Sequence, residues 1–146
     1  MLLSRNKLQN MILNINFKGY WRDVNKHGIP STSGIYLVYA CTYNSETDTV
    51  SLNNLIYIGQ AENLNERIMT HTKRSEFIKE CGGEENLCYS VAEVPVIDLN
   101  MVENALVYAQ KPPLNERLKD RYSYSQAEFH LEGRCALMKH KDFTIR

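Results

Sequence analysis

The longest uninterrupted run of apolar residues limits the architectures open to this chain of 146 residues. It covers only residues 35–41, whereas a helix that crosses a membrane needs about 20 apolar residues. This run and residues 50–59 are rich in β-branched and aromatic side chains, which is typical of strands. Asn44 and Asp48 lie between the two segments and favour a turn. The sequence therefore predicts a β-hairpin and no membrane-spanning segment.

Length and composition are those of one globular domain. Hydrophobic residues make up 43% of the chain and charged residues 23%, close to the averages for soluble proteins. The first residues interrupt their apolar positions with polar ones and lack the apolar core of a secretory signal, so we expect a cytoplasmic protein. The cysteines show no C-x-x-C spacing, and we interpret them as free, buried thiols: Cys41, Cys81, Cys88 and Cys135.

Hydrophobic periodicity predicts further elements on both sides of the hairpin. Helices are expected at 2–13, from about 62 to 73, at 77–81 and at 99–109, and a third strand is expected at 87–94. Lys111-Pro112-Pro113 ends the last helix. This order of elements predicts an α+β fold in which a small antiparallel three-stranded sheet is flanked by helices, with N- and C-terminal extensions.

Charge is distributed unevenly along a chain whose formal net charge is zero. Residues 1–33 carry a net charge of +4, residues 34–110 carry −7 and residues 111–146 carry +3. A polyanionic partner is therefore expected to contact the two basic flanks rather than the acidic centre. Ordinary scatter of solvated charge over a small surface is the alternative interpretation.

Several polar residues occupy positions where the apolar pattern predicts core. Glu103 lies on the apolar face of its predicted helix, and a buried carboxylate needs a cation, a set of hydrogen-bond donors or a raised pKa. A metal ion is one such cation and an arginine is another. Arg67 and His71 share the inward face of the preceding long helix. Such an arginine is either an ion-pair partner or a phosphate ligand. Tyr36 and Tyr57, taken alone, are typical of aromatic packing between strands.

Together these residues resemble the motif of a known family. Gly34-Ile35-Tyr36 and Tyr57-Ile58-Gly59 match the two tripeptides that name the GIY-YIG nuclease family. Four further residues follow in the order of that family's functional residues: Arg67, His71, Glu103 and Asn115. The resemblance covers residues 34–115, although the 37–56 segment between the tripeptides is longer than is common in the family.

The resemblance implies a compact, stand-alone GIY-YIG endonuclease that hydrolyses DNA phosphodiester bonds with one divalent metal ion, Mg²⁺ or Mn²⁺. Glu103 would hold the ion, and Arg67 would bind the phosphate and oppose the charge that develops in the transition state. Tyr36 would take the proton from the attacking water, while Tyr57 would orient water or phosphate, and these two roles could be exchanged.

Two further roles also follow from the resemblance. His71 would act as a proton relay or as a phosphate donor, and Asn115 would hold the Glu103 helix against the site. Residues 1–33 would then be a helical N-terminal extension, and residues 116–146 a C-terminal extension packed on the core. A catalytically silent module for binding nucleic acid or protein is the alternative, although it would be expected to have lost some of these site residues. Coincidental packing in an unrelated α+β protein is a third interpretation.

The expected partner is DNA, and the sequence does not distinguish duplex, branched and single-stranded forms or exclude RNA. A homodimer or a recruiting protein partner is also compatible with the sequence. The side chains expected to contact nucleic acid are basic residues near the motif and in the flanks: Lys18, Arg22, Lys26, Lys73, Arg74, Arg117, Lys119 and Arg121.

Overall fold

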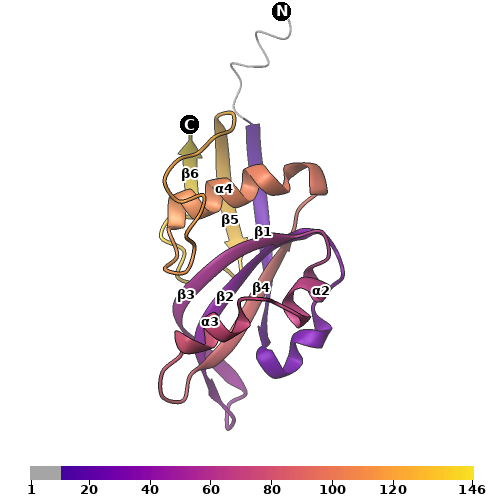
Figure 1. Cartoon of the computed structure of the whole chain (residues 1–146), viewed down its shortest axis with the longest axis vertical. Coiled ribbons are helices and arrows are strands. Elements are labelled where there is room, and N and C mark those ends of the chain that lie inside the picture. The colour runs from indigo at the N-terminus through magenta and orange to yellow at the C-terminus, as the bar shows by residue number, and fades with distance from the viewer. Residues whose placement is uncertain (1–10) are drawn as a thin grey trace, which may run out of the picture.

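The computed structural model describes residues 11–146 and shows a mainly β protein (Figure 1). Six strands form one mixed, curled sheet in the order β3-β2-β4-β1-β5-β6, and only the β1–β5 pair is parallel. The strands are β1 (Met11–Arg22), β2 (Gly34–Asn44), β3 (Thr49–Ala61), β4 (Asn86–Glu93), β5 (Ala127–Gly133) and β6 (Asp142–Ile145).

One substantial helix, α4 (Leu99–Gln110), packs against this sheet (Figure 1). Helices α2 (Leu64–Met69) and α3 (Arg74–Lys79) have six residues each. Two short 3-10 helices precede β2 and α4, namely η1 (Asp23–Gly28) and η2 (Val96–Asp98). Within residues 11–146 no helix has the length and apolar character needed to cross a membrane.

The predicted fold class is wrong, because the sheet has six strands rather than three. The three predicted strands are present as β2, β3 and β4, and the last predicted helix is present as α4. However, β1, β5 and β6 extend the sheet beyond β4, so segments expected as extensions supply half of its strands. The fold is therefore a curled half-barrel with one substantial helix, not a small sheet flanked by helices.

The N-terminal segment was predicted wrongly because its apolar residues were assigned the period of a helix instead of that of a strand. Residues 2–10 of the helix predicted at 2–13 lie outside the described residues, and the remaining three belong to β1. Ile15 and Phe17 are buried whereas Asn14 and Asn16 are exposed, which is the alternation of a half-buried strand. Leu13 and its neighbours fit a helical period only when the residues that follow are ignored.

The two faces of the sheet bury separate cores. On β2, Ile35, Leu37 and Tyr39 pack in the core that α4 covers. Tyr36 and Val38 point to the opposite face, where α2 and α3 pack. A strand buried on both faces is apolar throughout instead of alternating, which explains the seven-residue apolar run.

The structure corrects the interpretation of the cysteines as four free thiols. Cys41 of β2 and Cys88 of β4 form a disulfide, whereas Cys81 and Cys135 remain free. The two strands are neighbours, and Tyr39 pairs with Cys88 while Cys41 pairs with Asn86, so the two cysteines lie diagonally on one face. Their separation of 47 residues gives no sign of this pairing in the sequence.

Candidate active site

The candidate site lies at the β3 edge of the sheet, where elements from both faces meet. The segment after α4 runs along this edge, and the Leu114 N–H donates to the Ile56 carbonyl oxygen at 3.1 Å. The Asn115 side chain accepts from the Ile58 N–H at 3.0 Å and donates to the Ile58 carbonyl oxygen at 2.9 Å. These bonds satisfy backbone groups that an edge strand would otherwise leave open. Asn115 thus ties the segment after α4 directly to the strand that carries Tyr57.

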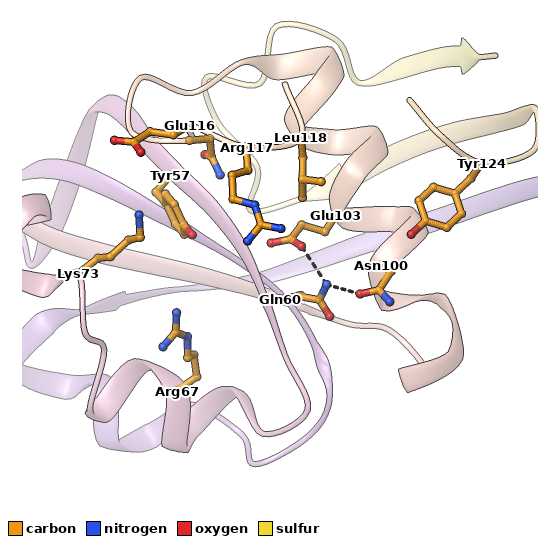
Figure 2. A pocket seen from close by; sticks show the side chains of 11 residues that line it. Tyr57, Gln60, Arg67, Lys73, Asn100, Glu103, Glu116, Arg117, Leu118 and Tyr124 are labelled. Carbon is orange, nitrogen blue, oxygen red and sulfur yellow. Dashed lines mark hydrogen bonds between the residues drawn. The ribbon is translucent and has the colours of Figure 1, made fainter. Parts of the chain in front are cut away.

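A pocket of about 550 Å³ opens at this edge (Figure 2). It brings together β3, α2, α4 and the segments that follow the two helices. The lining residues include six of the residues predicted for the site or for nucleic-acid binding. They are Tyr57, Gln60, Arg67, Lys73, Asn100, Glu103, Asn115, Glu116, Arg117, Leu118 and Tyr124.

The predicted residues Tyr36 and His71 form a buried pair. Tyr36 Oη lies 2.6 Å from His71 Nε2. The Lys73 N–H donates to His71 Nδ1 at 3.0 Å, so Nδ1 carries no proton. Burial, reinforced by the charges of Arg67 and Lys73, lowers the pKa of His71 to about 4. His71 is therefore neutral at pH 7 with its proton on Nε2, and it donates that proton's hydrogen bond to the Tyr36 oxygen.

Gly59 makes room for the Tyr36 ring. The two residues face each other across β2 and β3, and a Cβ atom on Gly59 would overlap the ring and hydroxyl of Tyr36. Tyr36 is 1% exposed, and burial raises the pKa of its hydroxyl well above the usual range; Tyr57 raises it further, while Arg67 lowers it. The packing of the tyrosine of the first tripeptide therefore requires a glycine at this position of the second tripeptide.

Tyr57 reaches the pocket from β3 and rests on aromatic rings. Its ring centroid lies 5.1 Å from that of Phe77 and 6.0 Å from that of His71, and Lys73 Nζ lies 5.6 Å from it. Burial and the charge of Glu103 raise the pKa of Tyr57, while Arg67 and Arg117 lower it. Of the two motif tyrosines, Tyr57 is thus the one that lines the pocket, and Tyr36 lies with His71 beside it.

Glu103 enters the pocket from α4, on the other face of the sheet. Gln60 Nε2 donates to Glu103 Oε1 at 2.8 Å and to Asn100 Oδ1 at 2.7 Å (Figure 2). Burial raises the pKa of Glu103, and the Gln60 hydrogen bond and the charges of Arg117 and Arg67 counter this rise. None of the ion pairs within residues 11–146 involves Glu103. Of the expected answers for a buried carboxylate, this part of the chain shows a hydrogen-bond donor, Gln60, and a raised pKa, but no arginine ion pair.

The donor atoms at Glu103 fit one type of metal site. Mg²⁺ keeps several of its waters and binds through one or two carboxylates together with substrate phosphate. One half-buried carboxylate matches that requirement, and the amide nitrogen of Gln60 bridges it to the amide oxygen of Asn100. The described residues contain no group of three or more His, Cys, Asp or Glu side chains placed to hold a metal ion, so they offer no fully protein-enclosed site.

The predicted phosphate-binding residues divide into two sets. Lys73 and Arg117 line the pocket beside Arg67. By contrast, Arg74 Nη2 lies 2.6 Å from Asp23 Oδ2 and Lys26 Nζ lies 3.3 Å from Asp23 Oδ1. These two cations therefore already have an anionic partner within the fold.

The remaining predicted cations do not line the pocket. The Arg22 guanidinium lies 3.4 Å from the centre of the Tyr43 ring, and Lys18 is an exposed residue of β1. Lys119 and Arg121 belong to the loop after α4, where their carbonyl groups accept hydrogen bonds from Lys111 and Asn104. The structure thus brings together only part of the predicted basic surface.

Besides Glu116 and Leu118, sequence reasoning missed four residues that shape the site. Gln60 directly follows the second tripeptide, and Asn100 precedes Glu103 by three positions on the same helical face, so both had a local signal. Tyr124 lines the pocket, and Asn104 holds the loop that carries it. Nothing in the sequence signals these two, because their role depends on the path of the loop.

Comparisons with known proteins give one distant similarity. No family model matches the chain, and no solved structure matches it. The chain is 28% identical over 108 residues to UvrABC system protein C of Fusobacterium nucleatum, a protein that contains a GIY-YIG domain. The aligned region covers 70% of this chain but only 16% of that protein. The chain therefore resembles, weakly and over part of its length, a region of that protein.

Proposed function

We propose that this chain is an endonuclease that hydrolyses phosphodiester bonds of DNA with one divalent metal ion, Mg²⁺ or Mn²⁺. One observation carries the proposal: Tyr57, Arg67 and Glu103, which lie on three different elements, line a single pocket. The hydrogen-bonded pair of Tyr36 and His71 lies beside it. The distant similarity to UvrABC system protein C supports the same class of reaction.

The charged groups of the pocket suit a phosphodiester substrate. Glu103 would hold the metal ion, which, when bound, supplies positive charge to a phosphate oxygen and to water. Arg67 offers two parallel N–H donors to the phosphate and opposes the charge that develops on it in the transition state. Lys73 and Arg117 add positive charge at the same opening. Three cations against two carboxylates, Glu103 and Glu116, leave the lining with net positive charge.

Tyr36 is the group that we assign to remove the proton from the attacking water. The Nε2–H of neutral His71 donates to the Tyr36 oxygen, and this bond stabilises the phenolate more than the phenol. The charge of Arg67 lowers the pKa of Tyr36 and so opposes the effect of burial. Tyr57, which contacts the pocket directly, would orient the water or the phosphate.

The test of metal-dependent cleavage uses the purified chain with supercoiled, linear, branched and single-stranded DNA and with RNA. We expect cleavage with Mg²⁺ or Mn²⁺, none in chelator, and none by Glu103→Gln, because this change keeps the side-chain size but removes the anionic ligand. Urea unfolding of the variant checks that it is folded. Full activity in chelator, or normal turnover by Glu103→Gln, would contradict the proposal, and DNA binding without any cleavage would support a catalytically silent module.

The tyrosine roles are tested with Tyr36→Phe and Tyr57→Phe, which delete only a hydroxyl group. We expect both variants to fold and to lose single-turnover cleavage by orders of magnitude, with the larger loss for Tyr36→Phe. Tyr43→Phe is a matched control on the same strand as Tyr36, because its hydroxyl bonds to the exposed Asp48 outside the pocket. A larger loss for Tyr57→Phe would indicate that the two tyrosines have exchanged roles. Normal cleavage by both variants would indicate that both tyrosines serve only packing.

A further inference from the structure

The pocket has a second half that the proposed reaction does not use. Arg67 and Lys73 lie on one side of Glu103, and Tyr124 lies on the other, with Asn100 beside it (Figure 2). Leu118 completes this second half, and the side chains of Tyr124 and Leu118 are 45% and 38% exposed. An aromatic ring and an aliphatic side chain therefore face solvent next to the charged part of the pocket.

A buried amide holds the loop that forms this half. Asn104 is 1% exposed and immediately follows Glu103 on α4. Its Nδ2 donates to the carbonyl oxygens of Leu118 and Arg121, each at 3.0 Å, and its Oδ1 accepts from the Ser123 N–H at 3.0 Å. A buried amide with these bonds fixes the loop over the pocket, because losing them would leave polar atoms unsatisfied in the core.

The two tyrosines of this loop have different roles: Tyr122 anchors the loop, and Tyr124 faces the pocket. Tyr122 is half-buried against the core beneath α4, and its hydroxyl donates to the Ser125 carbonyl oxygen at 2.5 Å. The centroids of the Tyr122 and Tyr124 rings are 5.9 Å apart. Tyr122 thus fixes the loop to the core, while Tyr124, two residues later, lies in the pocket wall.

We propose that Tyr124 is the stacking wall of a nucleobase subsite, which takes the base of the nucleotide next to the phosphate bound at Arg67. This inference rests on the proposed function and names the class of DNA that the site accepts. Aromatic side chains bind bases through their faces, and every base has such a face, so the contact tolerates any sequence.

The geometry of a base pair decides which DNA can use such a subsite. Inside a continuous duplex both faces of a base are covered by its neighbours, so a protein ring can stack only on a base that is unpaired or has left the helix. Tyr124 therefore favours single-stranded, branched or bulged DNA over continuous duplex. The loop bonds of Asn104 reduce the cost of binding, because the backbone next to Tyr124 is already held in place.

The test compares two short single strands of equal length, an oligothymidylate and an abasic sugar-phosphate chain, by fluorescence anisotropy with the full chain in EDTA. We expect the wild-type chain to bind the oligothymidylate about 5- to 150-fold more tightly than the abasic strand. Tyr124→Leu should lower the affinity for the oligothymidylate toward that for the abasic strand and leave the latter unchanged. Tyr124→Phe should retain the preference, because it keeps the ring.

Tyr108→Leu is the matched control. Tyr108 is an exposed tyrosine of α4 outside the pocket, and its removal should leave both affinities unchanged. Equal loss of affinity for both strands in Tyr124→Leu, or no loss for either, would overturn the subsite.

A cleavage assay with Mg²⁺ or Mn²⁺ separates this inference from the proposed function. If the base-dependent binding is present and the chain cleaves no DNA, the proposed function fails and the subsite stands. If the chain cleaves DNA and Tyr124→Leu shows no change in base preference, the subsite fails and the proposed function stands.

Discussion

Two groups of cations that look alike in the sequence have different surroundings in the fold. Around the pocket, Arg67, Lys73 and Arg117 form no ion pair among residues 11–146. Around η1, Lys26 and Arg74 both bind the carboxylate of Asp23, whose side chain is only 11% exposed.

The difference shows why net charge along a sequence does not identify which cations already have an anionic partner in the fold. A cation that is already paired with a carboxylate presents little net potential to a second anion. Asp23 also accepts a hydrogen bond from the Tyr89 hydroxyl at 2.7 Å, so this cluster connects η1 with α3 and β4. The pocket cations are therefore the ones that we expect to contact DNA, and the Asp23 cluster is expected to stabilise the fold.

The largest expected effect concerns cleavage. Arg67→Ala should lower the single-turnover rate at saturating DNA by about 10²- to 10³-fold, because it removes preorganised donors from the developing phosphate charge. Arg74→Ala should leave this rate unchanged in conditions where the variant is folded, because its partner is Asp23. Equal losses for the two variants would remove the distinction between the two groups of cations.

The second-largest effect is on stability at acid pH and comes from His71, which lies beside the pocket. The pKa of His71 falls from 6.5 to about 4 in the fold, so between these values the unfolded chain binds a proton that the folded chain does not. The free energy of unfolding should therefore decrease as pH falls from 6.5 to 4, by on the order of 2 to 3 kcal/mol. Urea unfolding of the wild type and of His71→Gln measures this, and the variant should lack that part of the decrease.

The exposed His27 provides the control for this measurement, since His27→Gln should keep the wild-type pH dependence. An unchanged pH dependence in His71→Gln would mean that burial and the charges of Arg67 and Lys73 do not keep His71 neutral.

A somewhat smaller effect is expected at Asp23. Asp23→Asn should lower the free energy of unfolding by about 2 kcal/mol at pH 7, because hydrogen bonds to a charged carboxylate are lost. Burial raises the pKa of Asp23, but the bonds from Arg74 and Tyr89 and the charge of Lys26 outweigh it and hold the pKa below 3.8. The difference between wild type and variant should thus persist down to about pH 4 and shrink as pH falls through the lowered pKa. A difference already lost at pH 6 would contradict this, and cleavage at pH 7 should be unaffected.

The smallest effect is on the salt dependence of DNA binding. Arg117→Gln should reduce the slope of log affinity against log salt by about 0.9 for duplex DNA, the value for one phosphate contact. Lys26→Gln should leave the slope unchanged, because Lys26 is paired with Asp23. Fluorescence anisotropy in EDTA at several salt concentrations measures both slopes. A reduced slope in Lys26→Gln alone would indicate that DNA contacts the N-terminal flank and not the pocket cations.

Elements with a strong local signal were predicted well. The apolar residues of β2 and β3, the turn between them and the proline-terminated α4 appear within a few residues of their predicted bounds. The helix predicted from 62 to 73 is shorter, because α2 covers only Leu64–Met69 and ends before His71. His71 therefore does not share a helical face with Arg67, and its position depends on the bond to the Lys73 N–H.

Elements defined by pairing partners were not predicted. β5 is recognisable only once β1 and β6 lie beside it, and the Cys41–Cys88 disulfide requires β2 and β4 to be neighbours. In each case the partners are distant in sequence, and a strand satisfies its hydrogen bonds only with a partner that its own sequence does not identify.

The sequence alone predicted which residues could carry chemistry at the candidate site. Tyr36, Tyr57, Arg67 and Glu103 break the apolar pattern or match the two tripeptides, and these features are local. Only the tertiary structure decided that residues from both faces of a sheet meet at the β3 edge, and that Tyr124 joins them from a loop. The reason is physical: local propensity sets the direction of a side chain along its own element, whereas the meeting of elements depends on long-range pairing and packing.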